Sequence, residues 1–153
     1  MGNVRRKDIC VIITNVEKRE QSKGRDQPLP SATGPALPDV LVVDDEPLML
    51  RAIALLLEGR AHPTCVASGA EALSVLARRA CACVLSDEDM PGMRGEILLG
   101  HVAARMPEAR RVLMSGRSPE WVEGALTSGR LHAFLDKPFS AEALFAALRL
   151  PRG

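Results

Sequence analysis

From about residue 39 onward, the chain alternates between two kinds of hydrophobic pattern. Short runs rich in Val, Leu and Ile are typical of strands that are buried on both faces. Each run is followed by a longer segment whose apolar residues recur every three or four positions, which is typical of a helix with one apolar face. The pattern predicts five strand–helix pairs in succession.

The boundaries of these elements follow from the runs and from residues that start or stop helices. The predicted strands cover residues 40–43, 64–67, 82–86, 112–114 and 131–135. The first predicted helix begins at Pro47, and the other four cover residues 69–79, 95–106, 118–129 and 140–150. Ser68 and Glu71 form a capping box, and Ser140 is a suitable cap for the last helix.

Strictly alternating strands and helices predict an α/β domain with a parallel sheet. Right-handed crossovers place helices on both faces of such a sheet, which makes it doubly wound. Ligands of these sheets bind at the carboxyl ends of the strands. The residues that follow the five predicted strands are therefore the first candidates for a functional site.

Residues 1–38 differ from the rest of the chain. They carry seven basic and four acidic residues, a local net charge of +3, whereas the remaining residues have a net charge of −2. Four prolines and two glycines between Gln21 and Pro38 are typical of a linker. We expect residues 1–38 to be a disordered extension and residues 39–153 to be the folded domain. Residues 9–13 are apolar enough for one isolated strand, and a start codon assigned too early remains an alternative.

Composition narrows the class of protein further. Apolar residues make up 46% and charged residues 25%, as in a soluble globular protein. The longest apolar runs are far shorter than the ~20 residues of a membrane helix. The four cysteines lack zinc-site spacing, which favours a reduced, cytoplasmic location. The three histidines are scattered and are interpreted as structural.

Carboxylates, a hydroxyl and an ammonium group follow the predicted strands. Asp44 and Asp45 follow the first strand, Asp87 the third, Ser115 the fourth and Lys137 the fifth. Two like charges 4 Å apart repel by about 4 kcal/mol at an effective dielectric constant near 20, so such a cluster favours a hard divalent cation. A small set of oxygen ligands points to Mg²⁺. An aspartate at such a site can accept a phosphoryl group as an acyl phosphate.

Four motifs at these strand ends carry a family resemblance. They are Val42-Val43-Asp44-Asp45-Glu46-Pro47, Asp87-Glu88-Asp89-Met90-Pro91-Gly92-Met93-Arg94-Gly95, Met114-Ser115-Gly116 and Leu135-Asp136-Lys137-Pro138-Phe139. In this order the chain resembles the receiver domains of two-component response regulators over residues 39–150. The resemblance implies the chemotaxis-regulator, flavodoxin-like (βα)5 fold, with five parallel strands in the order 2-1-3-4-5.

The resemblance also implies roles for the acidic residues. Asp87 would accept the phosphoryl group in a phosphorelay. Asp45 and Asp87 would bind Mg²⁺ directly, and Asp44 through a water molecule. The backbone carbonyl of Asp89 would be a further metal ligand.

Three other residues receive roles in the same way. Ser115 would donate a hydrogen bond to a phosphoryl oxygen and Lys137 would pair with the acyl phosphate. The Lys137–Pro138 peptide bond is expected to be cis. Ser115 and Phe134 would reposition when the domain switches between inactive and active states.

The partners implied by the resemblance are proteins. A sensor histidine kinase or phosphotransfer protein would supply the phosphoryl group, and a downstream protein would bind the face formed by residues 118–129, 131–135 and 140–150. A homodimer on activation is left open, and neither membrane contact nor direct DNA binding is expected. The domain would not be an enzyme beyond its Mg²⁺-dependent self-phosphorylation and autodephosphorylation.

Two positions depart from the family's commonest patterns. Asp89 adds a negative side chain two residues after Asp87, and Arg117 lies two residues after Ser115. The resemblance implies that side chains at these places influence how fast water removes the phosphoryl group. An altered lifetime of the phosphorylated state is therefore predicted, with its direction left open.

Other interpretations compete with these. Asp44 and Asp45 could serve only as helix caps, Ser115 as a turn former and Phe134 as a core residue. At the level of function, a receiver-like scaffold that works without phosphorylation is one alternative. A haloacid-dehalogenase-like phosphatase and a DNA-binding regulator are others, although the order of the acidic motifs and the sparse basic arm argue against them.

Overall fold

The computed structural model of the protein describes residues 36–150. Its five strands are β1 (Asp39–Val43), β2 (His62–Val66), β3 (Cys83–Asp87), β4 (Arg110–Ser115) and β5 (Ala133–Asp136). Its five helices are α2 (Pro47–Leu57), α3 (Gly69–Arg78), α4 (Gly95–Arg105), α5 (Val122–Ser128) and α6 (Ala141–Leu148). Apart from residues 36–38, the expected extension lies outside the described residues, as do the candidate strand at residues 9–13 and Cys10.

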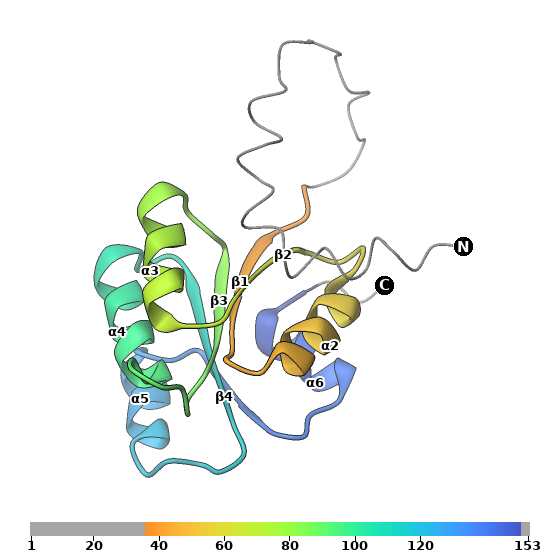
Figure 1. Ribbon diagram of the computed structural model, residues 1–153. Helices are drawn as coiled ribbons and strands as arrows, with labels where there is room; N and C mark the ends of the chain where they lie inside the picture. Colours follow the sequence, from red (N-terminus) through yellow and green to blue (C-terminus); the bar gives the residue numbers. More distant parts are fainter. Residues whose placement is uncertain (1–35, 151–153) are drawn as a thin grey trace.

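The strands form one parallel sheet in the order β2-β1-β3-β4-β5. This confirms the predicted fold class and strand order. Figure 1 shows α2 and α6 on one side of the sheet and α3, α4 and α5 on the other. None of the helices in the described part of the chain is long and apolar enough to cross a membrane.

Alternation along the strands divides the core into two layers. Val40 and Val42 of β1 pack into the cluster that contains the buried residues of α2 and α6. Leu41 and Val43 of the same strand pack into the cluster that contains those of α3, α4 and α5. Successive side chains of a strand point to opposite faces, so a strand covered on both sides is apolar at every position.

The helix predicted to begin at Ser118 begins later, at Val122. The Val122 N–H donates to the Pro119 carbonyl at 3.1 Å, which makes a tight turn instead of a first α-helical turn. Residues 117–121 therefore form a loop at the carboxyl end of β4. This loop becomes a wall of the cavity described below.

The fifth strand also begins two residues later than predicted. The Leu131 N–H donates to the Ala125 carbonyl at 3.0 Å, and Gly129 has the left-handed φ of 79° that ends α5. The apolar Leu131 thus closes the end of a helix instead of joining the sheet. The predicted caps are confirmed: Glu71 and Ala143 donate to the hydroxyls of Ser68 and Ser140.

Candidate functional site

The ends of β1 and β3 bring the acidic residues together. Val43 of β1 is paired with Ser86 of β3, so Asp44 and Asp87 follow side by side on neighbouring strands. The Glu46 N–H donates to Asp44 Oδ1 at 2.9 Å, which fixes one oxygen of that carboxylate. Asp44 is fully buried and Asp87 nearly so, whereas Asp45 is exposed.

These three carboxylates fit a magnesium ion. Asp44, Asp45 and Asp87 each offer one oxygen, and the three oxygens lie within 4.8 Å of one another. Hard oxygen donors on one solvent-accessible side chain and two buried ones suit Mg²⁺, which keeps several waters and binds only one or two carboxylates directly. The structure thus gathers the three predicted side-chain ligands at one point.

Lys137 reaches the same point from the end of β5. Its Nζ donates to Asp44 Oδ2 at 3.1 Å and to Asp87 Oδ1 at 2.9 Å. Its backbone N–H donates to the Ser115 carbonyl at 2.8 Å, which extends the pairing between β4 and β5 by one residue. The Lys137–Pro138 bond is cis, as expected. The ammonium group therefore bridges two carboxylates that come from different strands.

Burial and charge act in opposite directions on this group of residues. Burial raises the pKa of Asp87, the hydrogen bond from Lys137 opposes that rise, and the nearby carboxylates of Asp44 and Asp45 reinforce it. Burial alone would lower the pKa of Lys137, but the hydrogen bonds to Asp87 and Asp44 raise it overall. Lys137 therefore stays protonated, and its positive charge stabilises the ionised carboxylate of Asp87.

Ser115 lies on β4, the strand next to the one that carries Asp87, and Phe134 lies on β5, one strand further out. Ser115 is fully buried at the end of β4, and its hydroxyl accepts a hydrogen bond from the Arg117 N–H at 3.3 Å. Phe134 on β5 is half-buried and packs against the α3–α4–α5 core layer. Both residues lie where the sequence placed them, at or near the carboxyl edge of the sheet.

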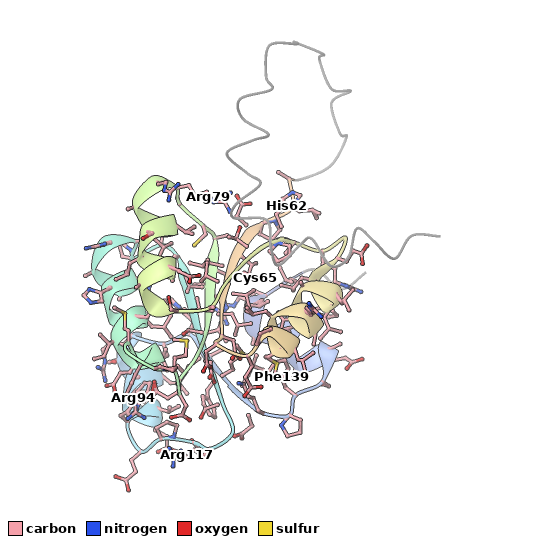
Figure 2. All side chains as sticks on the ribbon, in the orientation of Figure 1. His62, Cys65, Arg79, Arg94, Arg117 and Phe139 are labelled. Atoms are coloured by element: carbon pink, nitrogen blue, oxygen red, sulfur yellow. The ribbon has the colours of Figure 1, made fainter. Side chains whose placement is uncertain are left out.

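The side chain of Asp89 is not part of the cluster of three carboxylates and instead pairs with two arginines. Its Oδ1 lies 3.6 Å from a terminal nitrogen of Arg94 and 3.6 Å from one of Arg117. Figure 2 shows Arg94 and Arg117 at the same end of the molecule. The two positions that depart from the family pattern, Asp89 and Arg117, are therefore joined by an ion pair.

Glu88 is a site residue that sequence reasoning missed. It is 1% exposed, and its Oε1 accepts a hydrogen bond from the Glu96 N–H at 2.9 Å. Burial raises the pKa of its carboxyl group. The sequence did contain a signal for this role. Arg94, the residue before α4, cannot accept a capping hydrogen bond, so another residue must accept one from the first N–H groups of the helix.

Comparison with known proteins identifies the family. Residues 40–149 match the family model of the response regulator receiver domain. The chain is 40% identical over 108 residues to the response regulator protein FleR of Pseudomonas aeruginosa, covering 69% of this chain and 22% of that protein. It is 32% identical over 112 residues to the hydrogenase transcriptional regulatory protein HoxA of Cupriavidus necator, covering 72% and 23%.

A solved structure agrees with these matches. The signal receiver domain of an HD domain-containing protein from Pseudomonas fluorescens superposes with a TM-score of 0.68 at 29% identity, over 79% of this chain and 90% of that one. The chain spans less than a quarter of the length of FleR and HoxA. The chain belongs to the response regulator receiver domain family.

Proposed function

We propose that the chain receives a phosphoryl group on Asp87 from a sensor histidine kinase or a phosphotransfer protein. The observation that carries the proposal is the position of Lys137 Nζ, which lies 2.9 Å from Asp87 Oδ1 and 3.1 Å from Asp44 Oδ2. An ammonium group at this place can neutralise charge on an acyl phosphate as it forms. Family membership supports the same role.

In the proposed reaction, a carboxylate oxygen of Asp87 attacks the phosphorus of a phosphohistidine. A new P–O bond forms to Asp87 and the P–N bond of the donor breaks, with its electron pair passing to the imidazole of the donor. Ser115 would donate its hydroxyl hydrogen to a phosphoryl oxygen, and Lys137 would stay protonated and follow the charge from the carboxylate to the acyl phosphate.

Receiver domains bind Mg²⁺ at an acidic cluster, and the three carboxylates here fit that ion. When bound, the ion would neutralise the negative charge of the phosphoryl oxygens. Asp45 and Asp87 would hold it directly and Asp44 through water, with the backbone carbonyl of Asp89 as a further ligand.

Phosphorylation would then change what the domain binds. Movement of Ser115 and Phe134 would alter the face formed by α5, β5 and α6, where a downstream protein would dock.

We place this exchange in the cytoplasm and assign the receiver domain to residues 39–153. The ion pair between Asp89 and Arg117 is expected to change the lifetime of the acyl phosphate, which Asp89→Asn tests.

Phosphorylation of the full chain by acetyl phosphate tests the proposal. Intact-mass spectrometry should show one phosphoryl group on the wild-type protein in the presence of Mg²⁺ and none on Asp87→Asn. Asp136→Asn is the matched control, because Asp136 is an exposed carboxylate at the end of β5 and outside the cluster. It should be modified like the wild type.

Two results would contradict the proposal. Modification of Asp87→Asn would place the phosphoryl group elsewhere. A folded wild-type protein that neither binds Mg²⁺ nor accepts a phosphoryl group would favour the phosphorylation-independent scaffold.

A further inference from the structure

A second candidate site lies beside the phosphoryl site and uses other residues. A cavity of about 380 Å³ opens between the β3–α4 loop and the loop that precedes α5. We call it the Glu88 cavity. Its lining includes Glu88, Arg94, Glu96, Arg117, Glu120 and Trp121. Asp44, Asp45, Asp87 and Lys137 do not line it.

Glu88, which lines this cavity, has one carboxylate oxygen that accepts no hydrogen bond from residues 36–150. Glu88 is 1% exposed, and only its Oε1 is bonded, to the Glu96 N–H. Oε2 accepts no hydrogen bond from any residue in the described range 36–150. The nearest cation is a terminal nitrogen of Arg94 at 3.7 Å, beyond hydrogen-bonding distance. A buried carboxylate oxygen without a donor is costly, so this atom is a place where a donor from outside would be stabilising.

The charges around the cavity favour a cation. Three glutamates and two arginines line it, but Asp89 lies 3.6 Å from a terminal nitrogen of each arginine. Within residues 36–150, no basic side chain forms an ion pair with Glu96 or Glu120. Counted together with Asp89, the lining carries four carboxylates and two guanidinium groups, a formal net charge of −2, which favours a cation although Arg94 also lies 3.7 Å from Glu88 Oε2.

The other residues that line the cavity indicate which kind of cationic hydrogen-bond donor would fit it. Trp121 contributes an indole ring, and a planar guanidinium group can stack on such a ring while its N–H groups point at carboxylates. Guanidinium presents five donors in a fork, enough to bond Glu88 Oε2 and a second carboxylate at once. An ammonium group has neither the plane nor the fork.

We propose that the Glu88 cavity binds an arginine side chain of a protein partner. The contact would lie at the start of α5, outside the α5–β5–α6 face assigned to the downstream target. Arginine binding does not depend on whether Asp87 is phosphorylated. The proposal of this cavity and the proposal of phosphorylation on Asp87 can therefore fail separately.

Fluorescence provides a direct test, because Trp121 is the only tryptophan of the chain. The full chain is titrated with Nα-acetyl-arginine amide and, separately, with Nα-acetyl-citrulline amide, which has the same shape without the charge. At constant ionic strength, the arginine compound should give a saturable change in Trp121 emission and the citrulline compound none. Equal responses to both compounds would overturn the proposal.

Two glutamates of one segment provide a matched pair of variants. Both are exposed, but Glu120 lines the cavity and Glu123, on the first turn of α5, does not. Glu120→Gln should weaken arginine binding about fivefold, as expected for one charge at 4 Å in a water-like dielectric. Glu123→Gln should leave it unchanged. Equal effects of the two substitutions would contradict a specific site.

Glu88→Gln tests the buried oxygen itself. It keeps an amide oxygen for the Glu96 N–H, and circular dichroism checks that the fold is retained. Arginine binding should weaken at least about tenfold, because this charge is desolvated. A folded Glu88→Gln protein that binds as tightly as wild type would overturn the proposal. A further result would also overturn the proposal. If replacing Arg5, Arg6 and Lys7 by Gln changed the Trp121 emission of the full chain, the cavity would be occupied by the chain's own basic segment and not by a partner.

Discussion

Lys137 is the only lysine among residues 36–150, and two buried carboxylates share its ammonium group. The side chain of Lys137 is 17% exposed, that of Asp44 0% and that of Asp87 8%. Without this cation, two negative charges would face each other in a place that water reaches poorly. The residue therefore contributes to stability as well as to the proposed chemistry.

Replacing Lys137 by Met should lower the free energy of unfolding by about 2 kcal/mol in the absence of Mg²⁺, since each carboxylate loses a charge-assisted hydrogen bond. Urea denaturation measures the loss. In the double variant with Asp87→Asn, the added cost of Lys137→Met should be smaller, because one of the two repelling charges is gone. A single variant as stable as wild type would contradict this account.

His132 predicts a dependence of stability on pH. Its Nδ1 accepts a hydrogen bond from the Arg111 N–H at 2.9 Å, and partial burial of the ring together with the nearby arginines lowers its pKa, although the residue as a whole is exposed. The unfolded chain therefore binds the proton more readily than the folded one. Stability should fall as the pH drops below the ordinary histidine value of about 6.5.

Urea denaturation at about pH 7.5 and about pH 5.5 checks this expectation. His132→Asn keeps an acceptor near the Nδ1 position and does not titrate, so its stability should decline less over that interval. His101→Asn, at an exposed position of α4, is the control and should decline like wild type. Equal declines in all three proteins would remove His132 as the cause.

At the scale of the element, α4 is tied closely to the strand that carries Asp87. A Cβ atom on Gly95, its first residue, would lie 2.3 Å from the Asp87 carbonyl oxygen and 2.9 Å from Leu113 Cδ1. The Gly95 N–H donates to the Glu88 carbonyl, and the Glu96 N–H to the Glu88 side chain. The helix start is therefore positioned by contacts that leave no room for a methyl group.

Gly95→Ala should lower the free energy of unfolding by about 1–3 kcal/mol, because the backbone at Asp87 or α4 must shift. Gly100→Ala on the same helix is the matched substitution, since a Cβ there meets nothing within 4 Å. It should raise stability by about 0.5–1 kcal/mol through helix propensity. Thermal and urea denaturation of the two variants measure the contrast, and a neutral Gly95→Ala would show that the site tolerates the shift.

Arg111 of β4 ties together the loops after two helices. Its guanidinium donates to the carbonyls of Pro107 and Ala109 after α4, and of Gly129 and Arg130 after α5. The residue is 6% exposed, and burial lowers the pKa of its guanidinium. All four acceptors are backbone oxygens, and each would lose its hydrogen bond to Arg111 if that residue were replaced.

Arg111→Met should lower the free energy of unfolding by about 2–4 kcal/mol, at roughly 1 kcal/mol for each lost hydrogen bond. Arg105→Met, at an exposed position near the end of α4, should change it by less than about 0.5 kcal/mol. Chemical denaturation compares the two variants. Similar losses would mean that the four bonds add nothing beyond general surface effects.

At the scale of the whole molecule, the parallel sheet gathers groups that lie far apart in the chain. Asp44, Asp87 and Lys137 are separated by tens of residues, but Asp87 is the last residue of β3 and the other two directly follow β1 and β5, at one edge of the sheet. A metal at this edge would cross-link the ends of two strands. Binding of Mg²⁺ to the folded state alone should therefore stabilise the entire domain.

Mg²⁺ at about one hundred times its Kd should raise the free energy of unfolding by about 2.7 kcal/mol. Asp45→Asn should reduce this gain at the same Mg²⁺ concentration, because a ligand is lost. Asp39→Asn removes an exposed carboxylate at the opposite end of β1 and should leave the gain intact. Thermal denaturation with and without Mg²⁺ measures all three, and an undiminished gain in Asp45→Asn would exclude it as a ligand.

Hydrophobic periodicity is a local property, and it was enough to predict the five strand–helix pairs and the parallel sheet. A strand covered on both faces must be apolar throughout, and its polar residues can begin only where it ends. For that reason, the sequence alone placed Asp44, Asp87, Ser115 and Lys137 at strand ends. The resemblance to receiver domains then supplied the strand order and a role for each residue.

Tertiary structure decided the features in which distant segments compete for the same groups. Leu131 was predicted to lie in a strand, but its N–H donates to the Ala125 carbonyl at the end of α5. Ser118 was predicted to start a helix but lies in a loop. The side chain of Glu88 accepts a hydrogen bond from the Glu96 N–H, and that of Asp89 pairs with Arg94 and Arg117; hydrophobic periodicity predicts none of these contacts. Side chains beyond a strand end are no longer held by the alternation of the sheet, so packing between loops determines where they point.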